Sequence, residues 1–197
     1  MASSVIEMTC PGCGARVSIG QRQCAYCRRP IVISTISSLN QINPVELNKY
    51  VASYKNVLKD DPYQGEISAS LGACFLKMGR YDQAIETLRE AQVCDMENSE
   101  LYYFEAIALL RGKKAFVTQK SVIDRALECL DTAMMIEPKE IYRYYSAYLR
   151  YDFYFRKGLK IVPNYIACLN DAYRTGLSEY DIQQLFELLK VERPEAM

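Results

Sequence analysis

Residues 71–91 read LGACFLKMGRYDQAIETLREA, a stretch in which small residues alternate with bulky apolar ones. Gly72 lets two helices approach closely, and Gly79 turns the chain between them. Ala84 and Ala91 leave room for the bulky side chains that lie opposite. The stretch therefore predicts two antiparallel helices that are joined by a turn at Gly79.

The same pattern returns one period later in the chain. Tyr102, Ala106 and Leu109 repeat the apolar and small positions of the first helix. The positions of the second helix return eight residues later than a strict repeat would place them; they are Ala126, Leu130, Ala133 and Pro138. This delay predicts an elongated loop over residues 111–120.

The spacing resembles that of the tetratricopeptide repeat, a pair of antiparallel helices. The resemblance covers roughly residues 44–176, and it departs from the family at Ser68, where tryptophan is usual, and at Met96, where proline is usual. It implies a mainly α-helical fold, in which a short series of helix pairs winds into a superhelix.

In proteins with this repeat, the first helices line a concave groove that holds peptides or partner helices. By position, the resemblance assigns to this groove a mixed and partly apolar set of residues. The set is Glu66, Ala69, Ala73, Leu76 and Lys77 in the first repeat, and Glu100, Tyr103, Ile107, Leu110 and Arg111 in the second. The paired lysine and asparagine pattern of a carboxylate clamp is missing, so an apolar partner segment fits better. Alternatively, the C-terminal helices fold back into the groove.

Further helices are predicted on both sides of the repeats. Asn43 can cap a helix that begins at Pro44 and stops before Pro62. Three more helices are expected beyond Pro138; they run from Glu140 to Phe155, from Pro163 to Thr175 and from Glu179 to Val191.

Four cysteines stand in two pairs near the start of the chain, Cys10-Pro-Gly-Cys13 and Cys24-Ala-Tyr-Cys27. Two residues between thiolates let both sulfurs of a pair approach one ion, and two such pairs complete a tetrahedral site for structural Zn²⁺. The alternatives are two disulfides or four free thiols. The remaining cysteines, Cys74, Cys94, Cys129 and Cys168, are expected to be small buried apolar residues.

The first pair resembles the knuckle of a bacterial-type zinc ribbon, Cys-Pro-x-Cys-Gly. The second departs from that pattern, because Arg28 stands where glycine is common, which would strain the turn. Short strands are expected around the knuckles, at Val5-Ile6, Arg16–Ile19 and Ile31–Ile33. We therefore predict a zinc ribbon over residues 1–35, a linker over 36–43, and the repeat domain with C-terminal capping helices over 44–197.

The predicted helix over residues 140–155 carries two aromatic stripes, which is more than one buried face needs. One stripe consists of Tyr144, Tyr148, Tyr151 and Phe155, and the other of Tyr142, Tyr145, Leu149 and Phe153. Either the last two helices bury the second stripe, or it contacts a partner or a second copy of the chain.

Composition excludes several classes of function. The 24 basic and 24 acidic residues cancel, so no global positive field attracts nucleic acid or an anionic membrane. The chain has no histidine, which rules out Ser-His-Asp triads, Cys-His pairs and histidine metal ligands. The start of the chain lacks the features of a secretory signal, and no apolar run is long enough to span a bilayer. We expect a soluble cytoplasmic protein.

The residues that we expect to contact a partner combine the groove and the aromatic helix: Lys77, Tyr103, Ile107, Arg111, Tyr144, Tyr148, Tyr151 and Phe155. The sequence thus predicts a non-enzymatic adaptor or scaffold that binds a protein or a second copy of itself, without inserting into a membrane. The alternative is a nucleic-acid-associated factor that uses the ribbon and the basic loop over residues 111–120.

Overall fold

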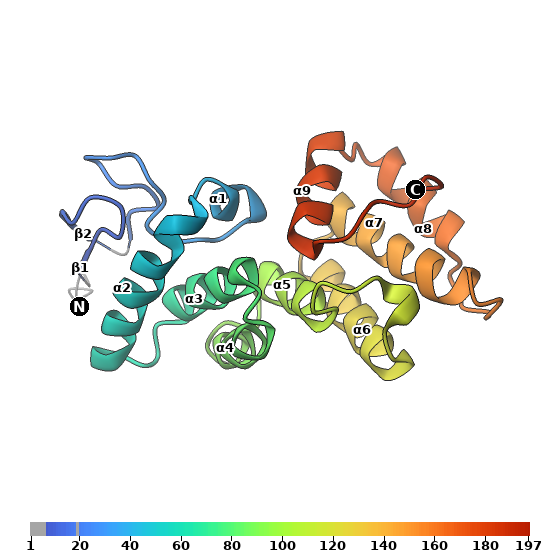
Figure 1. The fold of residues 1–197 in the computed structure, drawn as a ribbon, viewed down its shortest axis with the longest axis horizontal. Coiled ribbons are helices and arrows are strands. Elements are labelled where there is room, and N and C mark those ends of the chain that lie inside the picture. The colour runs from blue at the N-terminus through green and yellow to red at the C-terminus, as the bar shows by residue number, and fades with distance from the viewer. Residues whose placement is uncertain (1–6, 19) are drawn as a thin grey trace. The chain divides into compact units, whose positions relative to one another are not determined.

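The computed structural model describes residues 7–18 and 20–197 (Figure 1), and it divides into two compact units, of which the first ends at Asp95 and the second begins at Met96. The fold is mainly α-helical, as predicted, and a small two-stranded sheet lies near the N-terminus. None of the helices in the described residues is long and apolar enough to cross a bilayer.

The first unit begins with the sheet, in which β1 (Glu7–Thr9) pairs antiparallel with β2 (Arg16–Ser18). Met8 and Val17 face each other across the pair, and both are buried. The predicted strand at Val5-Ile6 and the predicted end at Ile19 lie outside the described residues.

The third predicted strand, Ile31–Ile33, does not form. Only an isolated bridge between Gln23 and Pro30 precedes it, and the three residues bury their side chains without a ladder partner. Their backbone is instead held by helices. The Tyr54 hydroxyl donates to the Ile31 carbonyl at 2.7 Å, and the Ile33 N–H donates to the Ser70 hydroxyl at 2.9 Å.

Residues 36–43, predicted as a linker, contain a short helix, α1 (Ile36–Asn40), which Thr35 caps. Ile36, Leu39 and Ile42 are buried. The 3₁₀ turn η1 (Pro44–Glu46) follows, and the Asn43 side chain accepts a hydrogen bond from the Val45 N–H as the predicted cap. These buried apolar side chains therefore pack the otherwise polar stretch against the rest of the unit.

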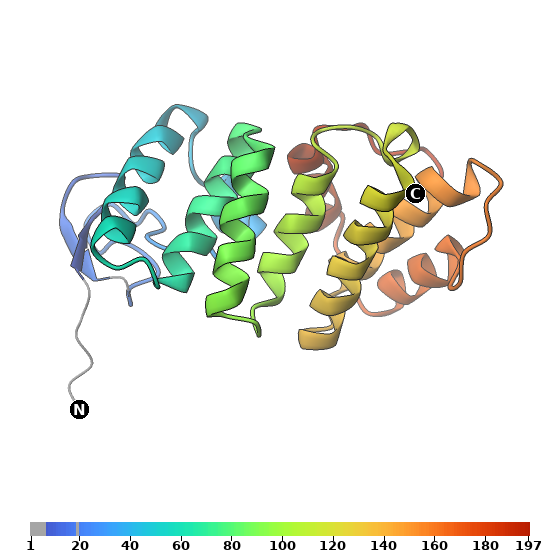
Figure 2. The ribbon, with the colours of Figure 1, turned by 90° about the horizontal axis from the view of Figure 1, so that it is seen from below.

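Three longer helices complete the first unit: α2 (Leu47–Asp60), α3 (Gly65–Met78) and α4 (Tyr81–Cys94). Helices α3 and α4 are the predicted antiparallel pair and pack side by side (Figure 2). A Cβ atom at Gly72 would lie 2.7 Å from Leu88 Cγ, so the absence of a side chain there lets the helices approach closely. Gly79, with φ +76°, ends α3 as expected.

The second unit opens with the second predicted pair, α5 (Ser99–Leu109) and α6 (Lys120–Ile136). The elongated loop between them contains the 3₁₀ turn η2 (Ala115–Val117). A buried carboxylate holds this loop, because Asp152 accepts a hydrogen bond from the Phe116 N–H at 2.7 Å.

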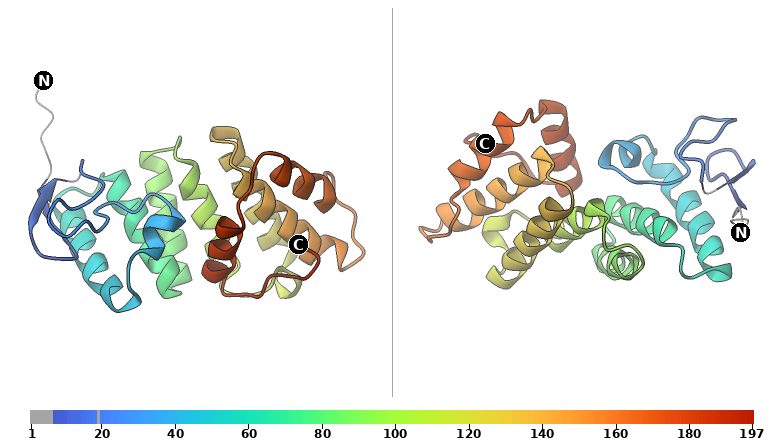
Figure 3. Two further views of the ribbon diagram at one scale, coloured as in Figure 1. Left: turned by 90° about the horizontal axis from the view of Figure 1, so that it is seen from above. Right: turned by 180° about the vertical axis from the view of Figure 1, so that it is seen from behind.

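The aromatic helix forms as α7 (Glu140–Leu149) and continues directly into η3 (Arg150–Phe155), a π-helical segment. It lies between α6 and the last two helices, α8 (Tyr165–Arg174) and α9 (Glu179–Leu189) (Figure 3). Helix α8 starts two residues after the predicted Pro163, because Asn164 serves as its N-cap. Ser178 caps α9 as predicted.

Candidate metal centre and partner surface

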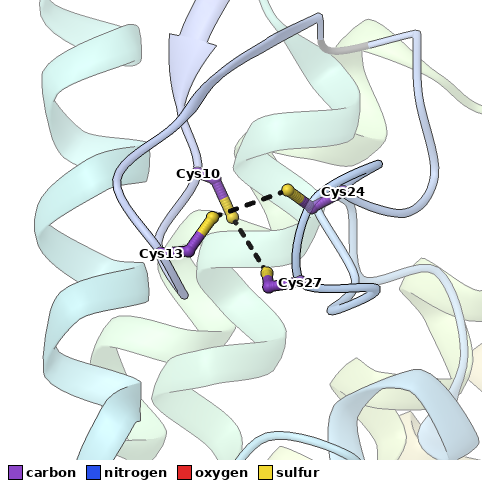
Figure 4. A group of neighbouring side chains, drawn as sticks. All are labelled: Cys10, Cys13, Cys24 and Cys27. Carbon is purple, nitrogen blue, oxygen red and sulfur yellow. Dashed lines mark hydrogen bonds between the residues drawn. The ribbon is translucent and has the colours of Figure 1, made fainter.

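The structure brings the four paired cysteines together, and their sulfurs point toward one another (Figure 4). All four Sγ atoms lie within 4.8 Å of one another, and the Cys10–Cys27 and Cys13–Cys24 pairs are each separated by 3.7 Å. In a tetrahedron with metal–sulfur bonds of about 2.3 Å, sulfurs stand about 3.8 Å apart. The four thiols therefore form a cluster that could hold one metal ion.

The two knuckles have matching backbone hydrogen bonds. In the first, the Gly14 N–H donates to the Cys10 carbonyl at 2.9 Å, and in the second, the Arg28 N–H donates to the Cys24 carbonyl at 2.8 Å. Both turns require a left-handed residue: φ is +79° at Gly14 and +58° at Arg28. Arg28 thus adopts a conformation that disfavours residues with a Cβ atom, as the departure from the ribbon pattern predicts.

Substitutions at Gly14 and Arg28, the two left-handed positions, should affect metal affinity differently. A Cβ atom at Gly14 meets no other atom within 4 Å, so Gly14→Ala adds only backbone strain, about 1 kcal/mol. We expect it to weaken metal binding about fivefold. Arg28→Gly relieves that strain and should leave the affinity equal or raise it. Chelator competition would measure both variants, and a gain of affinity in Gly14→Ala would contradict the assignment.

The surroundings of the cluster shift the pKa values of its thiols in different directions. Burial raises the pKa of Cys10 to about 12, whereas backbone N–H groups of Cys27 and Tyr26 lower the pKa of Cys24 to about 7. A divalent cation between the sulfurs favours the thiolate at every position. Metal binding would therefore release protons, and near neutral pH Cys10 would release a larger fraction of a proton than Cys24.

Several hydrogen bonds fasten the cluster to the helices of the first unit. The Tyr50 hydroxyl donates to the Pro30 carbonyl at 3.2 Å, and the Ser53 hydroxyl donates to the Thr9 carbonyl at 2.9 Å. The Arg29 guanidinium, which follows the second knuckle, pairs with Glu46 at 2.5 Å. The knuckles are thus held on α2 and η1.

All eight cysteines lie in the described residues, and none forms a disulfide. Cys74 and Cys129 are buried, as expected for small apolar residues. Cys94, the last residue of α4, is exposed, so the expectation of burial is wrong there. Cys168 is half-buried.

The groove positions of the first repeat are covered by the chain itself. Ala69, Ala73 and Leu76 are buried, and α1 packs against α3. Lys77 donates to two backbone carbonyls beside α1, those of Leu39 and Ile42, each at 2.8 Å. Its ammonium group is therefore engaged within the unit.

The apolar groove positions of the second repeat are covered in the same way. Tyr103, Ile107 and Leu110 are each 1% exposed, and α9 packs against α5. This is the alternative in which a C-terminal helix folds back into the groove. Arg111 lies beyond the end of α5 and is exposed.

The predicted aromatic stripe divides between core and surface. Tyr144 and Tyr148 are buried; the Tyr144 ring lies 6.3 Å from those of Tyr173 and Phe186, and the Tyr148 ring lies 5.2 Å from that of Phe186. The last two helices thus cover these tyrosines, and neither ring can reach a partner in this arrangement. The other half of the stripe packs against α8 near its start.

Tyr151, Phe155 and Tyr165 form a cluster that we call the aromatic patch. Their ring centroids are 4.9–5.6 Å apart, and Phe155 is 57% exposed. Of the residues predicted to contact a partner, Tyr151 and Phe155 are thus the aromatic ones that stay at the surface.

A buried hydroxyl in the second unit gives a test of the packing. The Tyr103 hydroxyl has no hydrogen-bond partner among the described residues, whereas the Tyr145 hydroxyl donates to the Ala106 carbonyl at 3.0 Å. Tyr103→Phe should therefore leave the free energy of unfolding unchanged or raise it by up to about 1 kcal/mol. Tyr145→Phe, the matched change, should lower it by about 1 kcal/mol. Urea denaturation would compare them, and equal losses would contradict this packing.

Sequence reasoning missed one neighbour of the basic loop. The Arg156 guanidinium lies 4.5 Å from the centre of the Phe116 ring, and the Lys157 ammonium lies 5.1 Å from it. The run Arg156-Lys-Gly-Leu-Lys160 was visible as a second basic stretch. Only the fold shows that the two stretches meet, because they are separated by two helices in sequence.

Among models of protein families, one matches this chain, and the match lies in the repeats. A tetratricopeptide-repeat family model matches residues 51–111. No curated protein matches the sequence significantly. Solved structures with some similarity include a crystal structure of MamA, with 22% identity over 74% of this chain and 88% of that chain and a TM-score of 0.48. Another is MamA 41-end from Desulfovibrio magneticus RS-1, with 19% identity over 79% of this chain and 76% of that chain and a TM-score of 0.45.

At TM-scores below 0.5, these structural matches bear on neither fold nor function. The family match rests on sequence, and it spans the α3–α4 helix pair and α5 of the structure. The chain therefore carries tetratricopeptide-like helical repeats behind an N-terminal four-cysteine cluster.

Proposed function

We propose that this chain is a non-enzymatic adaptor or scaffold within a larger assembly, and that its four-cysteine cluster holds one structural Zn²⁺. The tetratricopeptide-like repeats carry this proposal, because stacked helix pairs present extended surfaces to other proteins. Four thiolates around one ion leave no position for a substrate or a reactive water, which supports a structural role for the metal.

The donor set supports a thiophilic metal over hard cations such as Mg²⁺ or Ca²⁺. Four thiolates in a tetrahedral arrangement select Zn²⁺ or iron. Elemental analysis of freshly purified, reduced protein would decide between them, with about one equivalent of zinc expected for a single structural site. Less than about half an equivalent of zinc, or a stoichiometric amount of iron, would contradict the proposal. Free thiolates also favour a reducing compartment, so we propose a cytoplasmic location.

We propose the aromatic patch as the surface that contacts a protein partner. The apolar groove positions of both repeats are covered within their own units, whereas Phe155 remains largely exposed. Exposed aromatic rings are enriched where proteins bind each other. Self-association through the same patch would involve a second copy of the chain.

A pull-down from native extract tests this surface. Phe155→Ala should lose the partner that the unchanged protein retains in high salt, because the contact is apolar. Tyr63→Ala is the matched control, since Tyr63 is 84% exposed in the first unit. Retention of the same partner by both variants would contradict the proposed surface. Size-exclusion chromatography of the same variants would test self-association.

One observation favours a second candidate, a nucleic-acid-associated factor. The basic loop over residues 111–120 is joined in space by Arg156 and Lys157, which enlarges the positive surface. Binding to phosphates would fall steeply as salt rises, and DNA or RNA would be recovered with the protein. Recovery of a protein partner without nucleic acid would favour the adaptor.

A further inference from the structure

Two basic segments of the second unit lie side by side, and we call their surface the basic tip: residues 111–120, and residues 156–162, which follow η3. The Phe116 N–H donates to Asp152, and the Phe116 ring lies beneath Arg156 and Lys157. These contacts fix the loop against η3. The two segments therefore present one surface despite their distance in sequence.

The basic tip keeps a positive charge after its ion pairs are taken into account. The two segments contain seven lysines and arginines and no acidic residue. Among these cations, Lys114 pairs with Glu192, Lys120 with Asp124 and Arg156 with Asp152, and all three carboxylates lie outside the two segments. Lys113 and Lys160 are exposed and form no ion pair within the described residues. The surface thus stays positive in a chain whose net charge is zero.

Apolar side chains project into solvent from the same two segments. Val117 is 69% exposed in η2, and Leu159 and Val162 are 45% and 93% exposed in the turn that follows η3. Contact with phosphate groups in water does not lower the free energy of large aliphatic side chains. Their transfer from water to the boundary between lipid headgroups and acyl chains does lower it.

We propose that the basic tip docks on a bilayer surface that is rich in anionic phospholipids. The lysines bind the headgroups, and Val117, Leu159 and Val162 enter the interface. Single-stranded nucleic acid is the competing ligand, but it is bound by stacking on open aromatic faces. In the basic tip, the Phe116 ring is already covered by Arg156 and Lys157. This inference goes beyond the adaptor function and does not depend on it.

Vesicle co-sedimentation of the full chain tests the proposal. We expect binding to vesicles of phosphatidylcholine with phosphatidylglycerol, and little binding to phosphatidylcholine alone. Lys113→Gln with Lys160→Gln should weaken binding about twenty-five-fold, since each lysine near such a surface contributes about fivefold. Leu159→Ser with Val162→Ser should weaken it about tenfold through lost apolar transfer. Each double variant should keep the thermal stability of the unchanged protein.

Matched controls come from the first unit. Lys59 is an exposed lysine of α2, and Val93 is an 82% exposed valine of α4. Lys59→Gln and Val93→Ser should each bind vesicles like the unchanged protein. Equal sedimentation with neutral and anionic vesicles would overturn the proposal. It would also be overturned if only the lysine variant lost binding while a single-stranded oligonucleotide bound with the same dependence, because that pattern identifies a nucleic-acid site.

Discussion

Replacing Cys10 with serine should release the metal and unfold residues 7–34, while α3 and α4 persist. Two strands of three residues each cannot hold this segment together alone. Metal binding supplies typically about 10–16 kcal/mol in small structural zinc sites, which is the largest single contribution that we expect in this chain. Elemental analysis would report the lost metal, and hydrogen exchange would report lost protection in residues 7–34.

Cys94→Ser is the matched control for this prediction, because Cys94 is an exposed free thiol outside the cluster. It should retain the metal and the protection of residues 7–34. Chelation of the unchanged protein should reproduce the effect of Cys10→Ser, and added Zn²⁺ should reverse it. If Cys10→Ser kept a full equivalent of metal and an unchanged exchange pattern, the cluster would not be the metal site.

Replacing Tyr148 with alanine should lower the free energy of unfolding of the second unit by about 3–5 kcal/mol. The Tyr148 ring is 1% exposed and packs on Tyr145 and on Phe186 of α9. Its removal leaves a cavity that the helices can close only in part. Urea denaturation, followed by the circular dichroism of the helices, would measure the loss.

Tyr151→Ala provides the comparison from the same stripe. Tyr151 is only half-buried, so its loss should cost clearly less. If Tyr148→Ala left stability unchanged and abolished a partner interaction, the Tyr148 ring would lie at an interface and its packing against α9 would be wrong. Equal losses for the two variants would also contradict the division of the stripe.

Local spacing was enough to predict the parts of the fold that depend on neighbouring residues. Gly72, Gly79 and Ala84 define a helix pair through contacts within a short stretch, and the CxxC spacing defines the cluster in the same way. The cap at Ser178 likewise depends on residues within one turn. Such features follow from the sequence because their partners are close in sequence.

Features that depend on distant partners could not be predicted in this way. Ile31–Ile33 has the composition of a strand, but hydroxyls and helices far along the chain determine its conformation. Tyr148 and Tyr151 occupy one stripe, and only the positions of α8 and α9 decide which of them is buried. The meeting of Phe116 with Arg156 likewise needs the complete second unit.

The α1 segment, which Lys77 holds against α3, limits which free peptides can bind to that face of α3. Because α1 belongs to the same chain as α3 and is joined to it through η1 and α2, it acts as an intramolecular ligand for the face of α3 that it covers. A free peptide that bound the same face of α3 would have to displace this segment. The first unit is therefore selective before any partner arrives, since weak apolar peptides cannot displace the chain's own segment.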